Sequence, residues 1–245
     1  MEETGSFEPA PAHEDTLQIL WRSPGSAQKV AHSLLNGKHI DPYLAEEFRF
    51  LENHPAAWEE FFQWMGYRLK RSELGGSPFY FLEPRTELVS ETRLSRGATF
   101  LGLYMAWHFF MQGPGEPERI DAEEIFRRLV TSYPFHFLRA IFVRKAGVNP
   151  SPMELSEDQA ERLRANMRRE LAELARYRFI DVRPNVRAAW PDLVVHRLPA
   201  LYRFWELALH VRASGGNGQE ADIHQVVARV WGSVEPEPEP DEEES

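Results

Sequence analysis

Arginines recur along one predicted helix in the second half of the chain, and their chemistry is that of phosphate binding. Within residues 156–177, Arg162, Arg169 and Arg176 are spaced seven residues apart. At 100° per residue this spacing puts the three guanidinium groups on one side of the helix, with Arg168 at its flank. Guanidinium groups bind phosphate oxygens without reading the base sequence. The segment therefore predicts a sequence-independent contact with nucleic acid.

The other residues of this segment leave two interpretations open. The residues expected to form its buried stripe are Leu163, Met167, Leu171 and Leu174. Residues 139–187 contain eleven basic and seven acidic residues, an excess that favours weak, salt-sensitive phosphate binding. The alternative is an ordinary solvated helix face. Glu161, Glu170 and Glu173 lie three or four residues from several of the arginines and can pair with them.

Sequence signatures of catalysis are missing from the chain. It has no HExxH, GxSxG or GxxxxGK motif, so zinc peptidases, serine hydrolases and P-loop ATPases are not predicted. The nine histidines lack the i, i+4 spacing of a helical metal site. The adjacent acids at 59–60 and 123–124 diverge on their helices. We therefore predict a protein that is not an enzyme and has no cofactor and no metal.

The composition indicates a folded body between two acidic ends. The 245 residues include no cysteine, which excludes disulfides, thiolate catalysis and cysteine-bound metal clusters. Residues 1–15 and 235–245 hold 12 of the 38 acidic residues and no base, so the region between them has 26 acidic and 28 basic residues. Alternating proline and acid in 235–245 predicts disorder. No apolar run is long enough to span a membrane, and we expect a cytoplasmic protein.

Start and stop signals predict a first group of elements. Ser26, Asp41 and Pro55 are expected to begin three helices. The aromatic runs 67–70 and 79–82 are expected to pair as a hairpin. Three helices followed by a hairpin are typical of a winged-helix domain.

The same order is expected again further along the chain. A long apolar helix is predicted over 93–111, a second begins at Asp121, and a third begins at Ser156 with a capping box to Gln159. Residues 133–143 fit either a buried helix or a packed loop. The last predicted elements are a hairpin of 179–182 with 193–195 and a helix over 198–211.

These elements predict a mainly α chain with small β hairpins, arranged as tandem winged-helix domains. The domains are expected at 26–90 and 91–212. Residues 1–25 are expected to be a disordered acidic segment, and residues 213–245 a linker with a disordered acidic tail.

Aromatic residues are dense on two of the predicted helices. Those within 58–65 are Trp58, Phe61, Phe62 and Trp64, and those near the end of the chain are Tyr202, Phe204 and Trp205. They cover more of each helix than one small core needs, which favours contact with a second copy or a captured peptide. Alternatively, two small domains bury these side chains against each other.

Several short motifs occur in a fixed order between residues 34 and 211. They are Leu35-Asn36-Gly37-Lys38-His39-Ile40, Phe50-Leu51, Glu59-Glu60-Phe61, Arg68-Leu69-Lys70-Arg71, Phe79-Tyr80-Phe81-Leu82-Glu83-Pro84-Arg85, Leu94-Ser95, Leu103-Tyr104 and the run 171–174. In order and spacing the chain resembles the MukE and MksE family, the small winged-helix (KITE) subunit of MukBEF-type bacterial condensins.

The resemblance implies a function as well as a fold. A homodimer would bind the middle region of a MukF- or MksF-like kleisin and, through it, help a MukB- or MksB-like SMC ATPase to hold double-stranded DNA. Such a protein is nucleoid-associated and serves chromosome condensation and partition or plasmid defence. The alternative from a different class is a free-standing dimeric winged-helix transcription regulator.

The resemblance also implies residues. Arg162, Arg168 and Arg176 match basic positions that face DNA in the family, and Arg144 matches one across a loop. The seven-residue spacing described above adds Arg169 to this DNA-binding set. Where the family has two adjacent arginines near the end of the helix, this chain has Ala175-Arg176. The resemblance assigns no kleisin-contacting residues.

Overall fold

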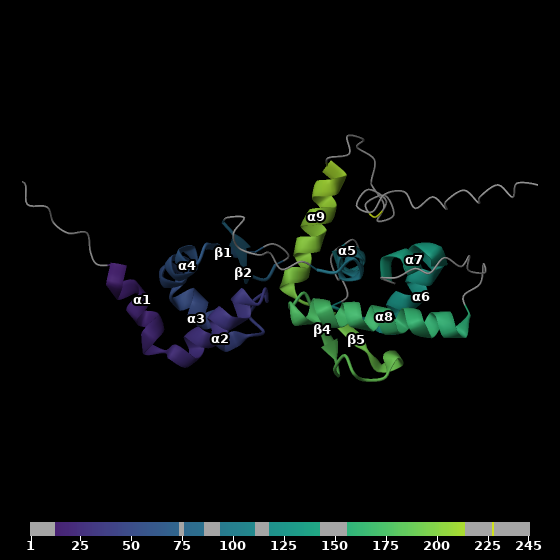
Figure 1. The fold of residues 1–245 in the computed structure, drawn as a ribbon, viewed down its shortest axis with the longest axis horizontal. Helices are drawn as coiled ribbons and strands as arrows, with labels where there is room; N and C mark the ends of the chain where they lie inside the picture. The colour runs from purple at the N-terminus through teal and green to yellow at the C-terminus, as the bar shows by residue number, and fades with distance from the viewer. Residues whose placement is uncertain are drawn as a thin grey trace, which may run out of the picture. The chain divides into compact units, whose positions relative to one another are not determined.

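The computed structural model describes residues 13–73, 76–85, 94–110, 118–142, 156–213 and 227, which are mostly helical with two small antiparallel sheets (Figure 1). The prediction of a mainly α chain with small hairpins is confirmed for these residues. Contacts divide the chain into two compact units. Unit 1 is Met1–Arg93 with Arg176–Arg178, and unit 2 is Leu94–Ala175 with Phe179–Ser245. Apart from residues 213 and 227, the predicted linker and acidic tail of 213–245 lie outside the described residues.

In the described part of unit 1, four helices are followed by a hairpin. In chain order they are α1 (His13–Arg22), α2 (Pro24–Leu35), α3 (Ala45–Asn53), α4 (Pro55–Trp64), β1 (Tyr67–Ser72) and β2 (Phe79–Pro84). The two strands are antiparallel, with Leu69 opposite Leu82. Between α2 and α3, Ile40 pairs with Tyr80 of β2 through two backbone hydrogen bonds of 3.1 and 2.8 Å. From α2 onward the order is helix, extended residue, two helices and hairpin.

Apolar residues at helical spacing form the core of unit 1. Val30 and Leu34, four residues apart on one face of α2, are both buried. They join Leu51 of α3 and the aromatic pair Trp58 and Phe62 of α4 in one cluster. The aromatic side chains of Trp58 and Phe62 on α4 are therefore buried in the core of this unit.

The N-terminal segment differs from its prediction. We expected residues 1–25 to be disordered, but His13–Arg22 form α1. Leu20 of this helix is buried in the core of unit 1, and Leu17 packs partly against it. Burial of apolar surface stabilises a short helix that its propensity alone would not. The next helix begins at Pro24 rather than Ser26, because the first turn is the position where proline is tolerated.

The start of α3 also differs from the prediction at Asp41. Its carboxylate accepts a hydrogen bond from the backbone N–H of Tyr43 at 2.9 Å, and so stabilises a turn before the helix instead of capping the helix itself. The same fully buried carboxylate accepts hydrogen bonds from Nη2 of Arg178 at 3.0 and 3.2 Å. Burial raises the pKa of Asp41 despite the guanidinium beside it.

The described part of unit 2 consists of five helices and a three-stranded sheet. Its elements are α5 (Arg96–Phe110), β3 (Arg119–Asp121), α6 (Ala122–Ser132), α7 (Phe135–Phe142), α8 (Glu157–Arg176), β4 (Ile180–Arg183), β5 (Val194–Arg197) and α9 (Tyr202–Ala213), with 3₁₀ turns η1 (Trp190–Asp192) and η2 (Pro199–Leu201). The strand order is β3-β5-β4, and both pairs are antiparallel. Within the stretch 133–143, Phe135–Phe142 form the helix α7, and β3 is a strand that the sequence did not predict.

Helix α5 is the central element of unit 2. It is apolar on all sides, as expected for a helix surrounded by other elements, and most of its residues are buried. Gly102 lets α9 approach it closely, because a Cβ at this position would lie 2.4 Å from Cζ of Phe204. Phe204 therefore packs directly on the backbone of α5.

Candidate nucleic-acid interface

Helix α8 begins and packs as its sequence predicts. The backbone N–H of Ser156 donates to Oε1 of Gln159 at 3.0 Å, and the N–H of Gln159 donates to Oγ of Ser156 at 3.3 Å. This is the capping box, and it fixes the first turn of the helix. The residues predicted for the buried stripe, Leu163, Met167, Leu171 and Leu174, are all buried. The face opposite the stripe is consequently the one available for a ligand.

Two of the five predicted arginines lie in one groove of unit 2. Arg162 and Arg168 line a groove of about 1180 Å³ together with Trp190 and Pro191, which lie between β4 and β5. Ala165 lies between the two arginines along α8 and also lines the groove, where its small side chain leaves room. Neither arginine has a hydrogen-bond or ion-pair partner among the residues that the structure describes. Their guanidinium groups are therefore available to an anion.

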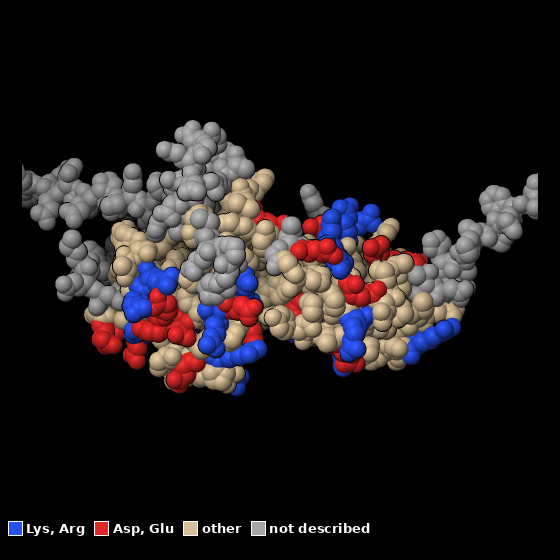
Figure 2. Space-filling model, turned by 180° about the vertical axis from the view of Figure 1, so that it is seen from behind, with Lys and Arg blue, Asp and Glu red and all other residues tan. Residues whose placement is uncertain are grey.

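The groove is not uniformly basic. Glu157, Asp158 and Glu161 also line it. Figure 2 shows that basic and acidic side chains are also interspersed over the face that it draws. A polyanion in this groove would meet repulsion as well as attraction, so binding should be weak and sensitive to salt.

A third arginine of α8 has a structural role that the sequence did not reveal. Arg164 donates from Nε and Nη2 to the carboxylate of Glu123 at 3.1 and 2.9 Å. Nε1 of Trp190 donates to the same carboxylate at 2.6 Å. The hydrogen bonds from Arg164, together with that from Trp190, hold the pKa of Glu123 below its usual range. These contacts join α8, α6 and η1, the three elements that form the groove.

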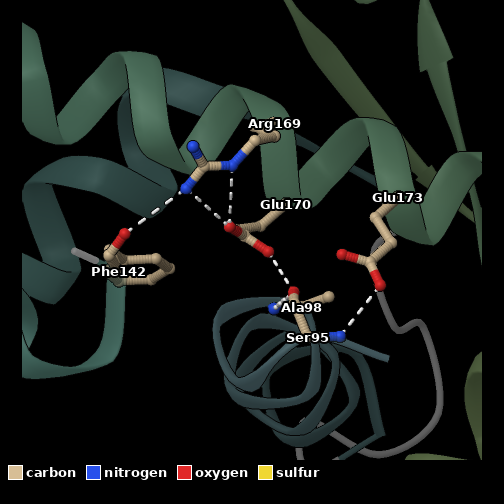
Figure 3. Close-up of polar contacts among 6 residues, drawn as sticks. All are labelled: Ser95, Ala98, Phe142, Arg169, Glu170 and Glu173. Atoms are coloured by element: carbon tan, nitrogen blue, oxygen red, sulfur yellow. Dashed lines mark hydrogen bonds and ion pairs between the residues drawn. The ribbon is translucent and has the colours of Figure 1, made fainter. Parts of the chain in front are cut away.

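Arg169 is engaged within the protein (Figure 3). Its Nε and Nη2 donate to Oε1 of Glu170 at 3.2 and 3.1 Å, and Nη2 also contacts the carbonyl oxygen of Phe142 at 3.5 Å. These donors point to α7 and to the buried carboxylate. Among the predicted phosphate-binding arginines that the structure describes, Arg169 is the one whose guanidinium hydrogen-bonds to a carboxylate and to a backbone carbonyl of the protein.

Glu170 and Glu173 do not lie on a solvated face, as the alternative interpretation assumed. Glu170 is only 2 % exposed, and it accepts a hydrogen bond from Oγ of Ser95. The backbone N–H of Ser95 donates to Oε1 of Glu173 at 2.8 Å, and Oγ of Ser95 accepts from the N–H of Ala98 at 3.1 Å (Figure 3). Both carboxylates therefore lie at the N-terminus of α5, where free N–H groups favour anions.

A signal for the burial of Glu170 was present in the sequence. At 100° per residue, Glu170 falls about 20° from Leu163 around the helix, at the border of the apolar stripe. A carboxylate at such a position needs buried donors, which Ser95 and Arg169 supply.

The last two predicted positions are Arg176 and Arg144. Arg176 is exposed at the end of α8, with Cζ 5.5 Å from the centre of the Tyr177 ring. Arg144 lies outside the residues that the structure describes. The structure thus brings Arg162 and Arg168 together in one groove and ties Arg169 to Glu170.

Neither a metal site nor a membrane span is found within the described ranges. There, no group of three or more His, Asp or Glu side chains is placed to hold a metal ion. No helix of those ranges has the length and apolar character needed to cross a membrane.

A protein-family model matches most of the chain. The family model for condensin complex protein MksE matches residues 26–208, which run from the first turn of α2 into α9 and include elements of both units. Helix α1 lies outside the match. No curated protein sequence matches the chain.

Proposed function

The chain belongs to the MksE family of condensin complex proteins, and on that premise we propose that it binds a kleisin as a homodimer and contributes a sequence-independent contact to double-stranded DNA. Membership makes it a non-catalytic subunit of a condensin complex, whose other subunits are an SMC protein and a kleisin. The contact with DNA is the part of the proposal on which the geometry bears most directly.

The proposed fold is a pair of winged-helix domains, corresponding to the predicted 26–90 and 91–212. In unit 2 the order α5-β3-α6-α7-α8-β4-β5, with β3 paired to β5, supports this assignment because a winged helix has its first strand beside its last. In unit 1 Ile40 takes the place of that first strand and pairs with β2. Helices α1 and α7 are additions to this plan. Helix α8 then holds the position of the recognition helix, and the β4–β5 connection is the wing.

The observation that carries the DNA contact is the placement of Arg162 and Arg168. Both line the groove between α8 and the β4–β5 connection, and neither forms an ion pair with a described residue. We assign the principal phosphate contacts to these two residues. Arg176 and Arg144 are proposed as flanking contacts, and Arg169 as a weaker one because its donors already bind Glu170.

Exposed aromatic side chains support a protein partner. Trp64 at the end of α4 is 88 % exposed, and Trp21 of α1 is 75 % exposed. Isolated apolar residues are common on surfaces, but two exposed tryptophans in one small unit favour a protein contact, since tryptophan is enriched in interfaces. They support partner binding by unit 1, while the groove of unit 2 is assigned to DNA.

Charge reversal tests the DNA contact. Arg162→Glu combined with Arg168→Glu in the full chain, with its kleisin bound, should lower duplex affinity at least about tenfold at low salt. The slope of log affinity against log salt should fall by about 1.8, because each lost phosphate contact removes about 0.9. Fluorescence anisotropy of a labelled duplex measures both quantities.

The matched control changes charge equally on unit 1. Arg22→Glu combined with Arg49→Glu should leave the salt slope unchanged, and both double variants should retain the kleisin. Equal affinity of the Arg162/Arg168 variant and the unmodified chain would refute the groove assignment. Strong preference for one duplex sequence over unrelated competitors would instead support the transcription regulator.

A further inference from the structure

Among its described residues, unit 2 has another pocket, lined by residues different from those of the α8 groove. It has a volume of about 430 Å³ and is lined by Tyr104 of α5 and by Arg127, Arg128, Thr131 and Ser132 of α6. All five side chains carry a hydroxyl or guanidinium group. None of the lining residues is acidic, so the pocket offers hydroxyl and guanidinium donors.

Tyr104 is the buried member of this set. It is 9 % exposed, yet its hydroxyl forms no hydrogen bond with another described residue. Burial raises the pKa of the Tyr104 phenol, so the hydroxyl keeps its proton and can donate it. The ring is buried but the hydroxyl oxygen is accessible at the pocket, where water or a ligand can accept a hydrogen bond from it.

The two arginines leave an excess of positive charge at the pocket. Both form ion pairs with the single carboxylate of Glu124, Arg128 from Nε at 2.6 Å. Nη1 of Arg128 also contacts Nδ1 of His108 at 3.1 Å. Burial and the nearby Arg128 lower the pKa of His108, which favours the neutral ring that can accept this hydrogen bond. Arg128 is therefore fixed in position, while Arg127 is 70 % exposed and can turn toward a ligand.

We propose that this pocket binds a phosphate of the DNA backbone and gives unit 2 a second DNA contact besides the groove of α8. The donors are the hydroxyl of Tyr104, the guanidinium groups of Arg127 and Arg128 and the hydroxyl of Ser132. Phosphate oxygens accept bonds from all of these groups. The inference rests on the proposed DNA function but uses different residues.

The weakness of a single contact favours a polymer over a small phosphate compound, because one exposed phosphate contact contributes little. A DNA backbone that also contacts Arg162 and Arg168 binds the second site as a linked event, which strengthens the whole contact.

Tyr104→Phe is the sharpest test, because it removes only the hydroxyl. In the full chain with its kleisin, duplex affinity should fall about three- to tenfold at low salt. Arg127→Ala should have a similar effect and lower the salt slope by about 0.9. Tyr43→Phe, at an exposed tyrosine of unit 1, is the matched control and should bind as the unmodified chain does. Thermal unfolding of Tyr104→Phe should be unchanged, since the hydroxyl has no described partner to lose.

Combining these variants with those of α8 separates the two proposals. If Tyr104→Phe and Arg127→Ala bind DNA normally while the Arg162/Arg168 variant is impaired, the pocket inference is overturned and the groove assignment stands. If only the pocket variants are impaired, the groove assignment fails and the pocket is supported.

Inorganic phosphate at millimolar concentration distinguishes the source of the ligand. Stabilisation by phosphate that Tyr104→Phe abolishes, with normal DNA binding, would assign the pocket to a small phosphate compound and overturn the DNA assignment.

Discussion

Gly97 of α5 and Glu170 of α8 approach so closely that no side chain fits between them. A Cβ built on Gly97 would lie 2.8 Å from Cγ and 2.9 Å from Cδ of Glu170, and 3.1 Å from Cδ1 of Phe142. The missing side chain lets the buried carboxylate reach Ser95 at the N-terminus of α5. The position of α8 relative to α5 thus depends on a glycine and a carboxylate.

Gly97→Ala tests this contact. An added methyl group has to displace a buried carboxylate and an aromatic ring, and we expect the free energy of unfolding to fall by about 1–3 kcal/mol. Gly25→Ala is the matched control, because nothing lies within 4 Å of a Cβ on that helical glycine. It should raise stability by about 0.5–1 kcal/mol. Urea unfolding of both variants measures the difference, and a neutral or stabilising Gly97→Ala would contradict the close approach.

The sequence predicted features of α8 that depend on local spacing. Leu163 and Leu171 were correctly assigned to the buried stripe, and Ser156 to the cap, because helical periodicity and capping act within one or two turns. The partners of Glu170 were not predictable in the same way. Ser95 lies 75 residues away in the sequence, so only the packing of α8 on α5 brings the two together.

Other elements were missed for a similar reason. The strand β3 is three residues long, and its pairing of Ile120 with Val195 spans a long stretch of sequence, so no local alternation marks it. Helix α1 follows an acidic start that indicated disorder, and its burial rests on Leu17 and Leu20. The arginines illustrate the same limit, since spacing placed Arg169 outward but could not show that Glu170 would hold it.

The contact of Gly102 with Phe204 predicts a second packing effect. Gly102→Ala should destabilise unit 2 by about 1–3 kcal/mol, because its Cβ would lie 2.4 Å from the Phe204 ring. Phe204→Leu should also destabilise, since it loses contact with the Phe179 ring, whose centre lies 4.8 Å away. The double variant should cost less than the sum of the two, because leucine leaves room for the added methyl group. Strict additivity in a urea-unfolding cycle would show that the two positions do not interact.

Glu123 should make the stability of unit 2 depend on pH in a defined direction. The pKa of its carboxyl is lowered by hydrogen bonds from Arg164 and Trp190, so the folded protein binds its proton less tightly than the unfolded chain. Its contribution is therefore fully present above the ordinary value of 4.5 and is lost as the pH falls through the lower folded value. Compared with Glu123→Gln, the unmodified chain should be more stable at pH 7, with the difference shrinking below pH 4.5.

Urea unfolding at several pH values measures this difference in stability between Glu123→Gln and the unmodified chain. Glu157→Gln is the control because Glu157 is exposed on the first turn of α8. A difference between Glu123→Gln and the unmodified chain that stays constant from pH 7 to pH 3 would show that the Arg164–Glu123–Trp190 contacts do not stabilise the charged carboxylate.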